Sequence, residues 1–244
     1  VYEVPEGKRD SKGRSIVNLL QMQKDEKVAA MICVEDFEQP VSLVLCTRNG
    51  VVKKTHLSAY RNHRKGGLIG INVDEGDTVI EARKTTGDDH LLILTHNGKG
   101  LRFHESQLRN QGRATRGVRG IRRREGDYVE AMLVVDDERL LLIAGANGLG
   151  IRTEFSAFLP RGGEGEDNTP RKRGGYGVIA MNAKALAGAL AVDKEDEIMM
   201  LTKKGQAIRC PVLNIRETNR GTKGVKLVDL AKGDRLVAIS RVVR

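Results

Sequence analysis

The chain has 244 residues, a formal net charge of +10, three cysteines and no tryptophan. It holds no apolar run of the about 18 residues that a membrane span needs, and its cysteines are odd in number, widely separated and free of any C-x-x-C pattern. These features exclude a membrane protein and a disulfide or zinc scaffold, and the few aromatics argue against a stacking platform for single-stranded nucleic acid. They predict a cytoplasmic protein with a polyanionic partner.

The first 36 residues read as part of a repeating unit. SKGRSIVNLL (11–20) is a glycine followed by an apolar strand, and KDEKVAAMIC (24–33) is a turn followed by a strand. Both patterns recur later in the chain, where an apolar hairpin precedes them, and here that hairpin is missing. Because the chain also begins with Val1 rather than methionine, we expect a piece of a longer protein that starts midway through a unit.

Four hairpins follow at intervals of about fifty residues. Each consists of an apolar run, a turn with glycine and a second strand: SLVLCTRNGVVKKT (42–55), LLILTHNGKGLRF (91–103), LLLIAGANGLGIRT (140–153) and IMMLTKKGQAIRC (198–210). Three of the turns contain Asn-Gly and the fourth contains Lys204-Gly205. Asn-Gly between apolar segments predicts type I′ turns, which need positive φ at both central residues.

Two further patterns follow each hairpin. One is a glycine before a short strand: KGGLIGINV (65–73), TRGVRGIRR (115–123), GGYGVIAMN (174–182) and TKGVKLVDL (222–230). The other is a tight turn before a strand: EGDTVIEA (75–82), EGDYVEAM (125–132) and KGDRLVAI (232–239). We interpret Asp77, Asp127 and Asp234 as turn formers rather than catalytic carboxylates, and the glycines Gly66, Gly67, Gly117, Gly177 and Gly224 as turn or bulge positions.

A unit of about fifty residues with four short strands has the size of a propeller blade. We therefore predict an all-β fold, a propeller-like disc of four-stranded blades forming a single domain over 1–244. The predicted units are the partial blade 1–36 and the repeats 37–87, 88–137, 138–195 and 196–244. We expect helical turns at 57–65, 106–110 and 153–159, and an exposed, mobile insertion at 161–173.

Basic residues recur after each hairpin and around the glycine before the short strand. The candidate DNA-binding residues are Lys12, Arg14, Arg61, Arg64, Lys65, Arg109, Arg113, Arg116, Arg119, Arg122, Arg171, Lys172, Arg173, Arg220, Lys223 and Lys226. A feature at the same point of every blade lies on the same face of a disc, so we expect these residues to form a curved basic band. Arginine forks match phosphate oxygens, and phosphate contacts hold duplex DNA without reading its sequence.

Two other functions stay open at this point. A protein-interaction propeller would bind at one flat face with little dependence on salt. An enzyme would need convergent polar groups at a central channel, but the sequence contains no G-x-S-x-G, P-loop or H-E-x-x-H motif. We expect no catalytic residue and no metal site in this chain.

Several segments resemble the C-terminal domain of the DNA gyrase A subunit, in one register from Val1 to Val243. They are YEVPEGKRDSKGRSIVNLLQM (2–22), NGVVKKT (49–55), RATRGVRGIRRREGDYV (113–129) and IMMLTKKG (198–205). The family's Gln-Arg-Arg-Gly-Gly-Lys-Gly box belongs to a first blade that this chain does not reach. Without it, the C-terminal domain of the related topoisomerase IV A subunit stays open as an alternative.

The resemblance implies a β-pinwheel, a six-bladed disc whose neighbouring blades exchange a strand, of which about four and a half blades are present here. It implies that duplex DNA wraps around the basic rim, so that the parent enzyme can introduce negative supercoils. Implied partners are the gyrase A N-terminal region of the same chain and the gyrase B subunit in an A2B2 holoenzyme. ATP and Mg²⁺ are used by that holoenzyme, an ATP-hydrolysing type IIA topoisomerase, and no cofactor is implied for this domain, which is itself non-catalytic.

Overall fold

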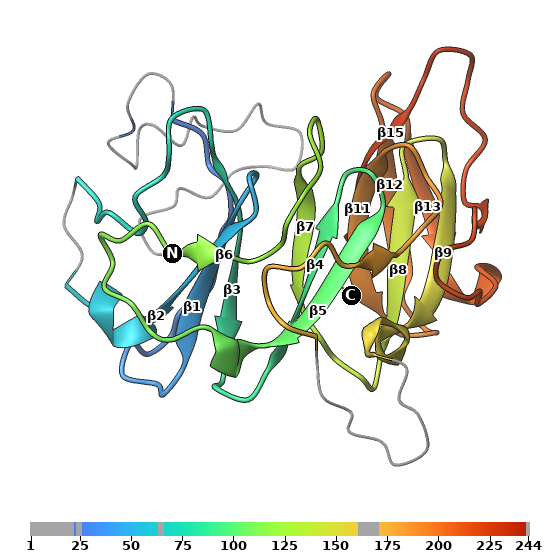
Figure 1. Ribbon diagram of the computed structural model, residues 1–244. Coiled ribbons are helices and arrows are strands. Elements are labelled where there is room, and N and C mark those ends of the chain that lie inside the picture. Colours follow the sequence, from blue (N-terminus) through green and yellow to red (C-terminus); the bar gives the residue numbers. More distant parts are fainter. Residues whose placement is uncertain (1–21, 23–25, 63–65, 161–170, 243–244) are drawn as a thin grey trace.

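The computed structural model describes residue 22 and residues 26–62, 66–160 and 171–242. Within these residues, four antiparallel sheets stand one after another, from β1–β3 at one side of the molecule to β12, β13 and β15 at the other (Figure 1). Short 3-10 helices follow the hairpins: η2 (Leu57–Tyr60), η3 (Glu105–Gln107), η4 (Phe155–Phe158) and η5 (Val212–Asn214). The predicted all-β fold of blade-like sheets is confirmed.

The sheets are built from the hairpins and the strands that follow them. The first, in the order β3-β1-β2-β6, contains β1 (Ser42–Thr47), β2 (Val51–His56), β3 (Val79–Thr85) and β6 (Val118–Arg119). The second, in the order β10-β5-β4-β7, contains β4 (His90–Thr95), β5 (Lys99–His104), β7 (Val129–Val134) and β10 (Val178–Ile179). The third, in the order β11-β8-β9-β14, contains β8 (Leu140–Gly145), β9 (Leu149–Glu154), β11 (Leu186–Val192) and β14 (Val225–Lys226). The fourth, in the order β13-β12-β15, contains β12 (Glu197–Thr202), β13 (Ala207–Pro211) and β15 (Leu236–Arg241).

The outer strand of each four-stranded sheet comes from the following repeat. The two-residue strands β6, β10 and β14 complete sheets whose other strands lie earlier in the chain. This is the strand exchange that the resemblance implied. A sheet and a sequence repeat are therefore different sets of residues, and the unit boundaries 37–87, 88–137, 138–195 and 196–244 stay predictions. Residues 1–21 and 23–25 of the partial blade 1–36, and residues 161–170 of the insertion, lie outside the described residues.

The hairpin turns differ from the predicted type I′ geometry. In the first turn, the Gly50 N–H donates to the Thr47 carbonyl at 2.9 Å, and Gly50 has φ +84°. Every positive φ among the described residues belongs to a glycine, so Asn49, Asn97 and Asn147 are not left-handed. The loop between β1 and β2 is three residues long, which favours a type I turn closed by a left-handed glycine. The prediction of hairpins was right, and that of their turn type was wrong.

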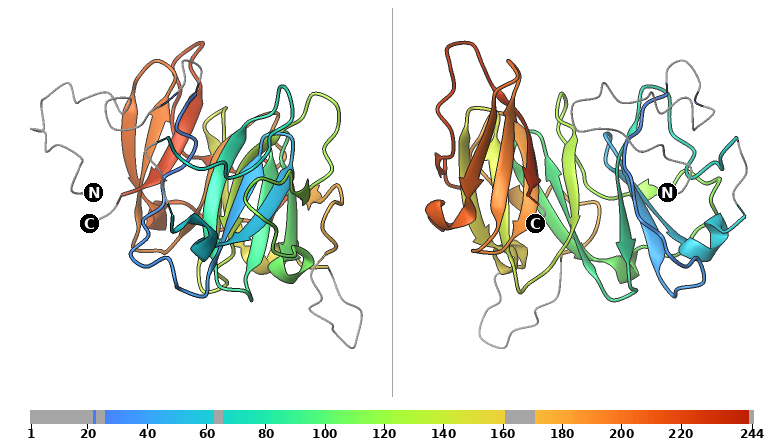
Figure 2. Two further views of the ribbon diagram at one scale, coloured as in Figure 1. Left: turned by 90° about the vertical axis from the view of Figure 1, so that its left-hand side faces the viewer. Right: turned by 180° about the vertical axis from the view of Figure 1, so that it is seen from behind.

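The apolar core lies between successive sheets. In β4, Leu91 and Ile93 pack in a cluster with Val44 and Val52 of the first sheet. Their neighbours Leu92 and Leu94 point the other way, into a cluster with residues of the third sheet. Because both faces of the strand are covered, β4 reads as a continuous apolar run rather than an alternating one. At the sheet edges away from the outer strands, neighbouring sheets contact one another through β3, β7, β11 and β15, in that order. Figure 2 shows the sheets from two further directions.

Candidate nucleic-acid interface

The three outer strands present one side chain each to solvent at the same register. In the backbone ladders, Arg119 pairs with Val51, Ile179 with Lys99 and Lys226 with Leu149. The partner in each pair is the hairpin residue that directly follows the turn glycine. The preceding residue of each strand is a valine that packs against the core. Successive side chains of a strand point to opposite faces. The outward position is therefore repeated from sheet to sheet by backbone pairing.

Glycine precedes each outer strand because the chain approaches a neighbouring main chain there. A Cβ on Gly117 would lie 2.6 Å from the Val52 carbonyl oxygen, and one on Gly177 would lie 2.3 Å from that of Gly100. Both glycines also have positive φ. The interpretation of Gly117, Gly177 and Gly224 as structural glycines is thus confirmed, and they bring the outer strands tightly onto the sheets.

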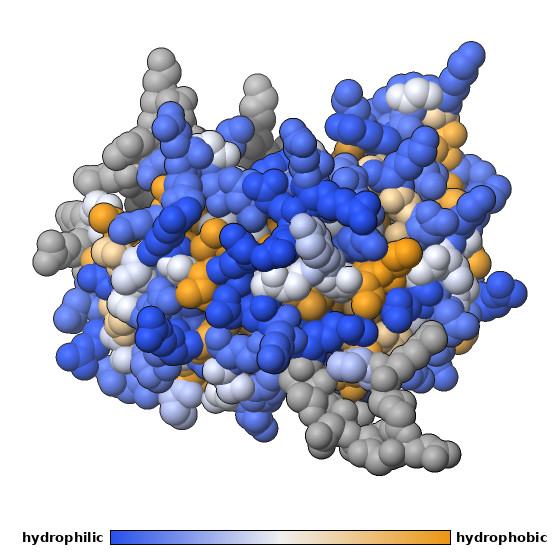
Figure 3. Space-filling model, viewed as in Figure 1, coloured by the Kyte–Doolittle hydropathy of each residue, from blue (hydrophilic) through white to orange (hydrophobic). Residues whose placement is uncertain are grey.

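Hydrogen bonds also join one outer segment to the next. The Asn72 N–H donates to the Thr115 carbonyl at 2.9 Å, and the Arg122 N–H donates to the Gly175 carbonyl at 2.8 Å. The Asn182 N–H repeats the bond, to Thr222, at 2.8 Å. The outer segments are therefore tied together from sheet to sheet, and the side chains on them lie along one continuous surface. That face is mostly hydrophilic, with small hydrophobic patches (Figure 3).

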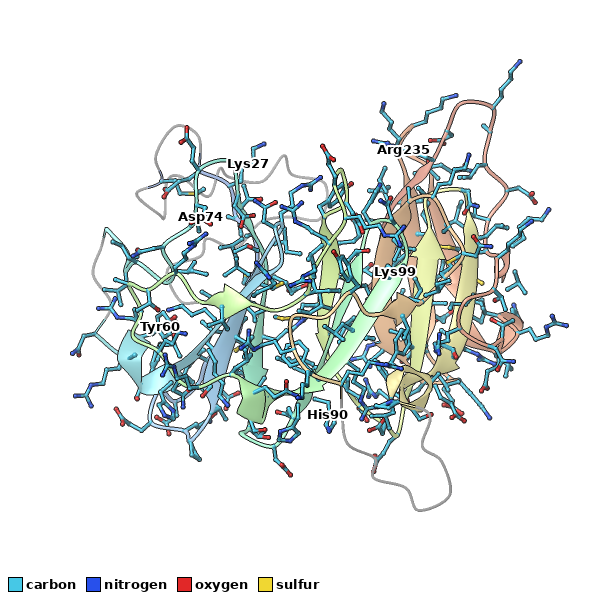
Figure 4. The ribbon with its side chains drawn as sticks, in the orientation of Figure 1. Lys27, Tyr60, Asp74, His90, Lys99 and Arg235 are labelled. Atoms are coloured by element: carbon cyan, nitrogen blue, oxygen red, sulfur yellow. The ribbon has the colours of Figure 1, made fainter. Side chains whose placement is uncertain are left out.

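An open groove of about 810 Å³ lies beside β6. Its charged lining residues are Asp74, Arg116, Arg119, Arg122, Arg123, Arg124 and Glu125. Smaller hollows lie beside β10 and β14, and basic side chains line these as well. Asp74, which lines the groove, and Lys99, which lines a hollow beside β10, are labelled in Figure 4.

The arginines of the groove fall into two kinds. Arg116 is exposed but paired with Asp74, and Arg123 donates to the Asn49 carbonyl at 3.1 Å and to the Asn49 side-chain oxygen at 2.7 Å. Arg119 and Arg122 are exposed. The stretch 113–124 therefore contributes both groups that hold the hairpin and groups that face solvent.

Several predicted DNA-binding residues are exposed. They are Arg61, Arg109, Arg116, Arg119, Arg122, Lys172, Lys223 and Lys226. Two of them have acidic partners besides Arg116: Arg61 lies 3.1 Å from Glu38, and Lys226 lies 2.7 Å from Asp229. Exposed ion pairs of this kind contribute little to stability, so a phosphate can compete with the carboxylate for the cation.

Other predicted residues turn toward the protein. Arg171 donates to the Phe158 carbonyl at 3.3 Å, and Arg220 donates to the Ala157 carbonyl at 2.6 Å. Arg173 donates to the carbonyls of Gln107 and Arg119. Arg113 is partly buried. These arginines join outer segments to the neighbouring sheets. Lys12, Arg14, Arg64 and Lys65 lie outside the described residues.

The sequence reasoning missed a second set of basic residues, of which three are buried and the fourth, Arg209, is exposed. The fourth residue after each hairpin glycine is basic: Lys54, Arg102, Arg152 and Arg209. Arg102 makes a two-pronged contact with Asp137 at 2.7 and 2.6 Å, while Lys54 lies 2.6 Å from the carboxylate of Glu105. The constant spacing from the turn glycine is the signal that could have found them.

Glu105 is fully buried at the contact between the first and second sheets. Its carboxylate accepts hydrogen bonds from the Gly87 N–H, the Asp89 N–H and the Thr85 hydroxyl, besides pairing with Lys54. Burial acts to raise the pKa of Glu105, but the bond to Lys54 and the other donors outweigh it, so that the pKa is lowered. This site is structural.

Lys53 holds the start of the arginine-rich stretch. It is 1% exposed, and its Nζ donates to the carbonyls of Gly112 at 2.9 Å and Arg113 at 2.6 Å. Burial, and then the Arg113 guanidinium, lower the pKa of Lys53 to about 8. A buried side chain of the first sheet thus positions the chain just before Arg116 and Arg119.

The described residues contain no group of three or more His, Cys, Asp or Glu side chains able to hold a metal ion. In that same part of the chain, no helix is long and apolar enough to cross a membrane.

Comparisons with known proteins fit this architecture. A family described as "DNA gyrase C-terminal domain, beta-propeller" matches residues 1–35, 42–86, 89–136 and 196–242. The DNA gyrase A subunit of Mycolicibacterium smegmatis is 38% identical over 246 residues, which cover 98% of this chain and 28% of that protein. The chain thus spans under a third of the length of such curated relatives.

Two solved structures are similar over most of the chain. A structure described as the C-terminal domain of DNA topoisomerase IV has a TM-score of 0.83 at 27% identity, over 94% of this chain and 70% of that one. A DNA gyrase A C-terminal domain has a TM-score of 0.80 at 25% identity, over 96% of this chain and 76% of that one. Both likenesses support the fold described above.

Proposed function

Because this chain belongs to the DNA gyrase C-terminal domain family of β-propellers, we propose that it binds duplex DNA along the basic band and bends it around the outer strands. In the proposed role, the chain wraps DNA so that its parent enzyme can introduce negative supercoils in an ATP-dependent reaction. The chain itself contributes binding and bending, and the strand-passage chemistry belongs to other parts of the parent.

The observation that carries the proposal is the repeated register of the outer strands. Arg119 and Lys226 occupy the same pairing position on different sheets, and the backbone bonds between outer segments align them along one surface. A duplex that crosses these sheets would therefore meet a cation at this position on the first and on the third sheet. Such contacts go to phosphates, so they hold the DNA without reading its sequence.

The energies are compatible with bending. Smoothly bending 20–30 base pairs by 40–90° costs roughly 1–6 kcal/mol. Each phosphate contact releases about one counterion, so several contacts offset that cost at moderate salt. The exposed residues Arg109, Arg116, Arg119, Arg122, Lys172, Lys223 and Lys226 suffice in number for such contacts.

The wider setting is part of the proposal. We place the chain in the cytoplasm, attached to a gyrase A N-terminal region and assembled into an A2B2 enzyme with a gyrase B subunit. ATP and Mg²⁺ act in that assembly and not in this domain. The Mycolicibacterium smegmatis relative reported above is an A subunit of DNA gyrase, which supports this setting.

Binding can be tested with the charge-reversal triple variant Arg116→Glu, Arg119→Glu and Arg122→Glu. We expect wild-type affinity for an unspecific duplex to fall steeply with salt, and the variant to lose about tenfold or more in affinity with a salt slope lower by about 3. The control reverses three exposed lysines off the band, Lys84, Lys194 and Lys232, for the same change in net charge. Equal losses in both variants would count against the band, and binding at a flat face with no salt dependence would favour a protein-interaction propeller.

A role in topoisomerase IV is the second candidate, favoured by the TM-score of 0.83 to a domain of that enzyme. The two roles differ in the reaction of the parent. For gyrase, removal of residues 1–244 from the parent assembled with its partner should abolish ATP-dependent negative supercoiling of relaxed plasmid. For topoisomerase IV, the intact assembly would decatenate linked circles and introduce no negative supercoils.

A further inference from the structure

The outward positions of the outer strands are not basic on every sheet. The residue before each outer-strand glycine is Arg116, Tyr176 or Lys223, and the outward strand residue is Arg119, Ile179 or Lys226. The segment from Tyr176 to the end of β10 therefore carries an aromatic and an aliphatic side chain at the two positions where the segments of β6 and β14 carry two cations each. Of the three outer strands β6, β10 and β14, the middle one is thus the strand whose two positions hold an apolar pair instead of cations. The outer segment before β6 also places an exposed isoleucine, Ile69, at the outward position.

Both members of this pair are exposed. Tyr176 is 51% exposed and Ile179 is 48% exposed. The core contact of β10 is made by Val178, which packs against the cluster between the second and third sheets. Because Val178 fills the inward position, Ile179 points outward, and its exposed apolar surface is available to another molecule.

Cations surround Tyr176. The guanidinium carbon of Arg122 lies 5.3 Å from the centre of its ring. Tyr176 also lines two neighbouring hollows, one of about 190 Å³ that includes Lys99 and one of about 400 Å³ that includes Arg171 and Lys172. The ring stands between two basic hollows, so a polyanion drawn to them would meet it directly.

We propose that Tyr176 and Ile179 enter the minor groove of a duplex held on both sides by the cations of β6 and β14, and that the DNA bends most sharply there. Apolar side chains that enter the minor groove unstack a base step and bend the duplex toward the major groove. Such a wedge acts only where phosphates are held on either side of it, and Arg119 and Lys226 stand at the matching register on the adjoining outer strands. This inference rests on the proposed function.

The wedge has a specific consequence for DNA sequence. Pyrimidine–purine steps unstack most easily, so a duplex with a central TA step should bind more tightly than one with a stiff A-tract at the same place. Phosphate contacts alone would not produce that preference.

The test uses the double variant Tyr176→Ser and Ile179→Ser, with Met199→Ser and Leu201→Ser as the control. The control residues lie on β12, away from the outer strands, and are 37% and 42% exposed. An end-labelled duplex of about 30 base pairs with a central TA step reports bending by energy transfer, since it is short against the persistence length of DNA. Thermal unfolding followed by circular dichroism checks that each variant is folded.

For the wedge variant we expect affinity to fall about fivefold to thirtyfold, energy transfer to fall and the preference for the TA step to vanish. The salt slope should stay at the wild-type value, because no phosphate contact is lost. A folded variant that binds and bends the duplex as the wild type does would overturn the wedge while leaving DNA binding intact. Wild-type protein that binds no duplex would overturn the proposed function and the wedge together.

A direct reporter follows from the absence of tryptophan in the chain. In the variant Tyr176→Trp, the single indole should be quenched when the duplex is added, whereas in Leu201→Trp it should not respond. An unresponsive indole at position 176 on a protein that binds DNA would overturn the wedge and leave the apolar pair as a contact for another protein.

Discussion

At the contact between the first and second sheets, Lys54 reaches the buried carboxylate of Glu105 at 2.6 Å. At the equivalent contact between the third and fourth sheets, Arg152 donates to the main-chain carbonyl of Val212 at 3.1 Å, and its Nε has no hydrogen-bond partner among the residues that the structure describes. Both cations are 7% exposed, and both stand four residues after a hairpin glycine. The repeat thus places a cation between neighbouring sheets, and one residue of the next repeat, Glu105 or Val212, decides whether it meets a carboxylate.

The largest expected effect comes from removing the cation of the buried ion pair between Lys54 and Glu105. The substitution Lys54→Met should lower the free energy of unfolding by about 3–5 kcal/mol, because it leaves Glu105 buried without its cation. The matched variant Arg152→Met should change it by about 1 kcal/mol or less, because no buried carboxylate loses its partner. Urea unfolding followed by circular dichroism measures both, and equal effects would contradict the distinction between the two contacts.

Removing both charges should recover part of that loss. In the double variant Lys54→Met with Glu105→Gln, the amide oxygen can still accept from the Gly87 and Asp89 N–H groups, and no charge is buried. We expect about 1–3 kcal/mol of coupling between the two substitutions in a double-mutant cycle of unfolding free energies. Additive losses would mean that Lys54 and Glu105 act independently.

Low pH should weaken the contact between Lys54 and Glu105 and leave that between Arg152 and Val212 unchanged. The folded-state pKa of Glu105 is lowered, so its stabilisation is complete above the unfolded-state pKa and is lost as the pH falls through the folded-state pKa. The difference in unfolding free energy between the wild type and Glu105→Gln should therefore shrink as the pH falls from 7 toward 3. The Arg152→Met variant should show no such change in its difference from the wild type.

A separate effect is expected in alkali, from Lys53. Because burial lowers its folded-state pKa to about 8, the unfolded chain binds the proton more tightly than the folded chain does. The contribution of Lys53 to stability should therefore rise with pH from about 8 to about 10.4, the ordinary lysine value. Unfolding free energies of the wild type and Lys53→Met, measured across that range, should diverge in favour of the wild type, and parallel curves would contradict this.

The repeat made much of the fold predictable. A glycine recurs after each apolar run, at Gly50, Gly98, Gly148 and Gly205, and this spacing located the hairpins. The turn type was missed because Asn-Gly also fits a longer loop in which only the glycine is left-handed.

The candidate interface was less predictable than the fold. Sequence position placed Arg119 and Arg171 in the same band, but Arg119 is exposed while Arg171 donates to a carbonyl of η4. Nothing local distinguishes them, because the partner of Arg171 is set by how one sheet packs on the next. The pair Tyr176 and Ile179 was overlooked for a different reason. The sequence was searched for basic residues at equivalent points of the repeats, and apolar residues at those points were not considered.

The exchanged outer strand has a consequence for how such a chain can change in length over evolution. Since β14, in the predicted repeat 196–244, completes the third sheet, deleting that repeat would remove a strand from its predecessor as well. Duplicating or removing an interior repeat as a whole would instead leave each remaining sheet with a following repeat that supplies its outer strand. The number of repeats can therefore vary by whole interior units, which would lengthen or shorten the proposed DNA-binding surface in steps of one sheet.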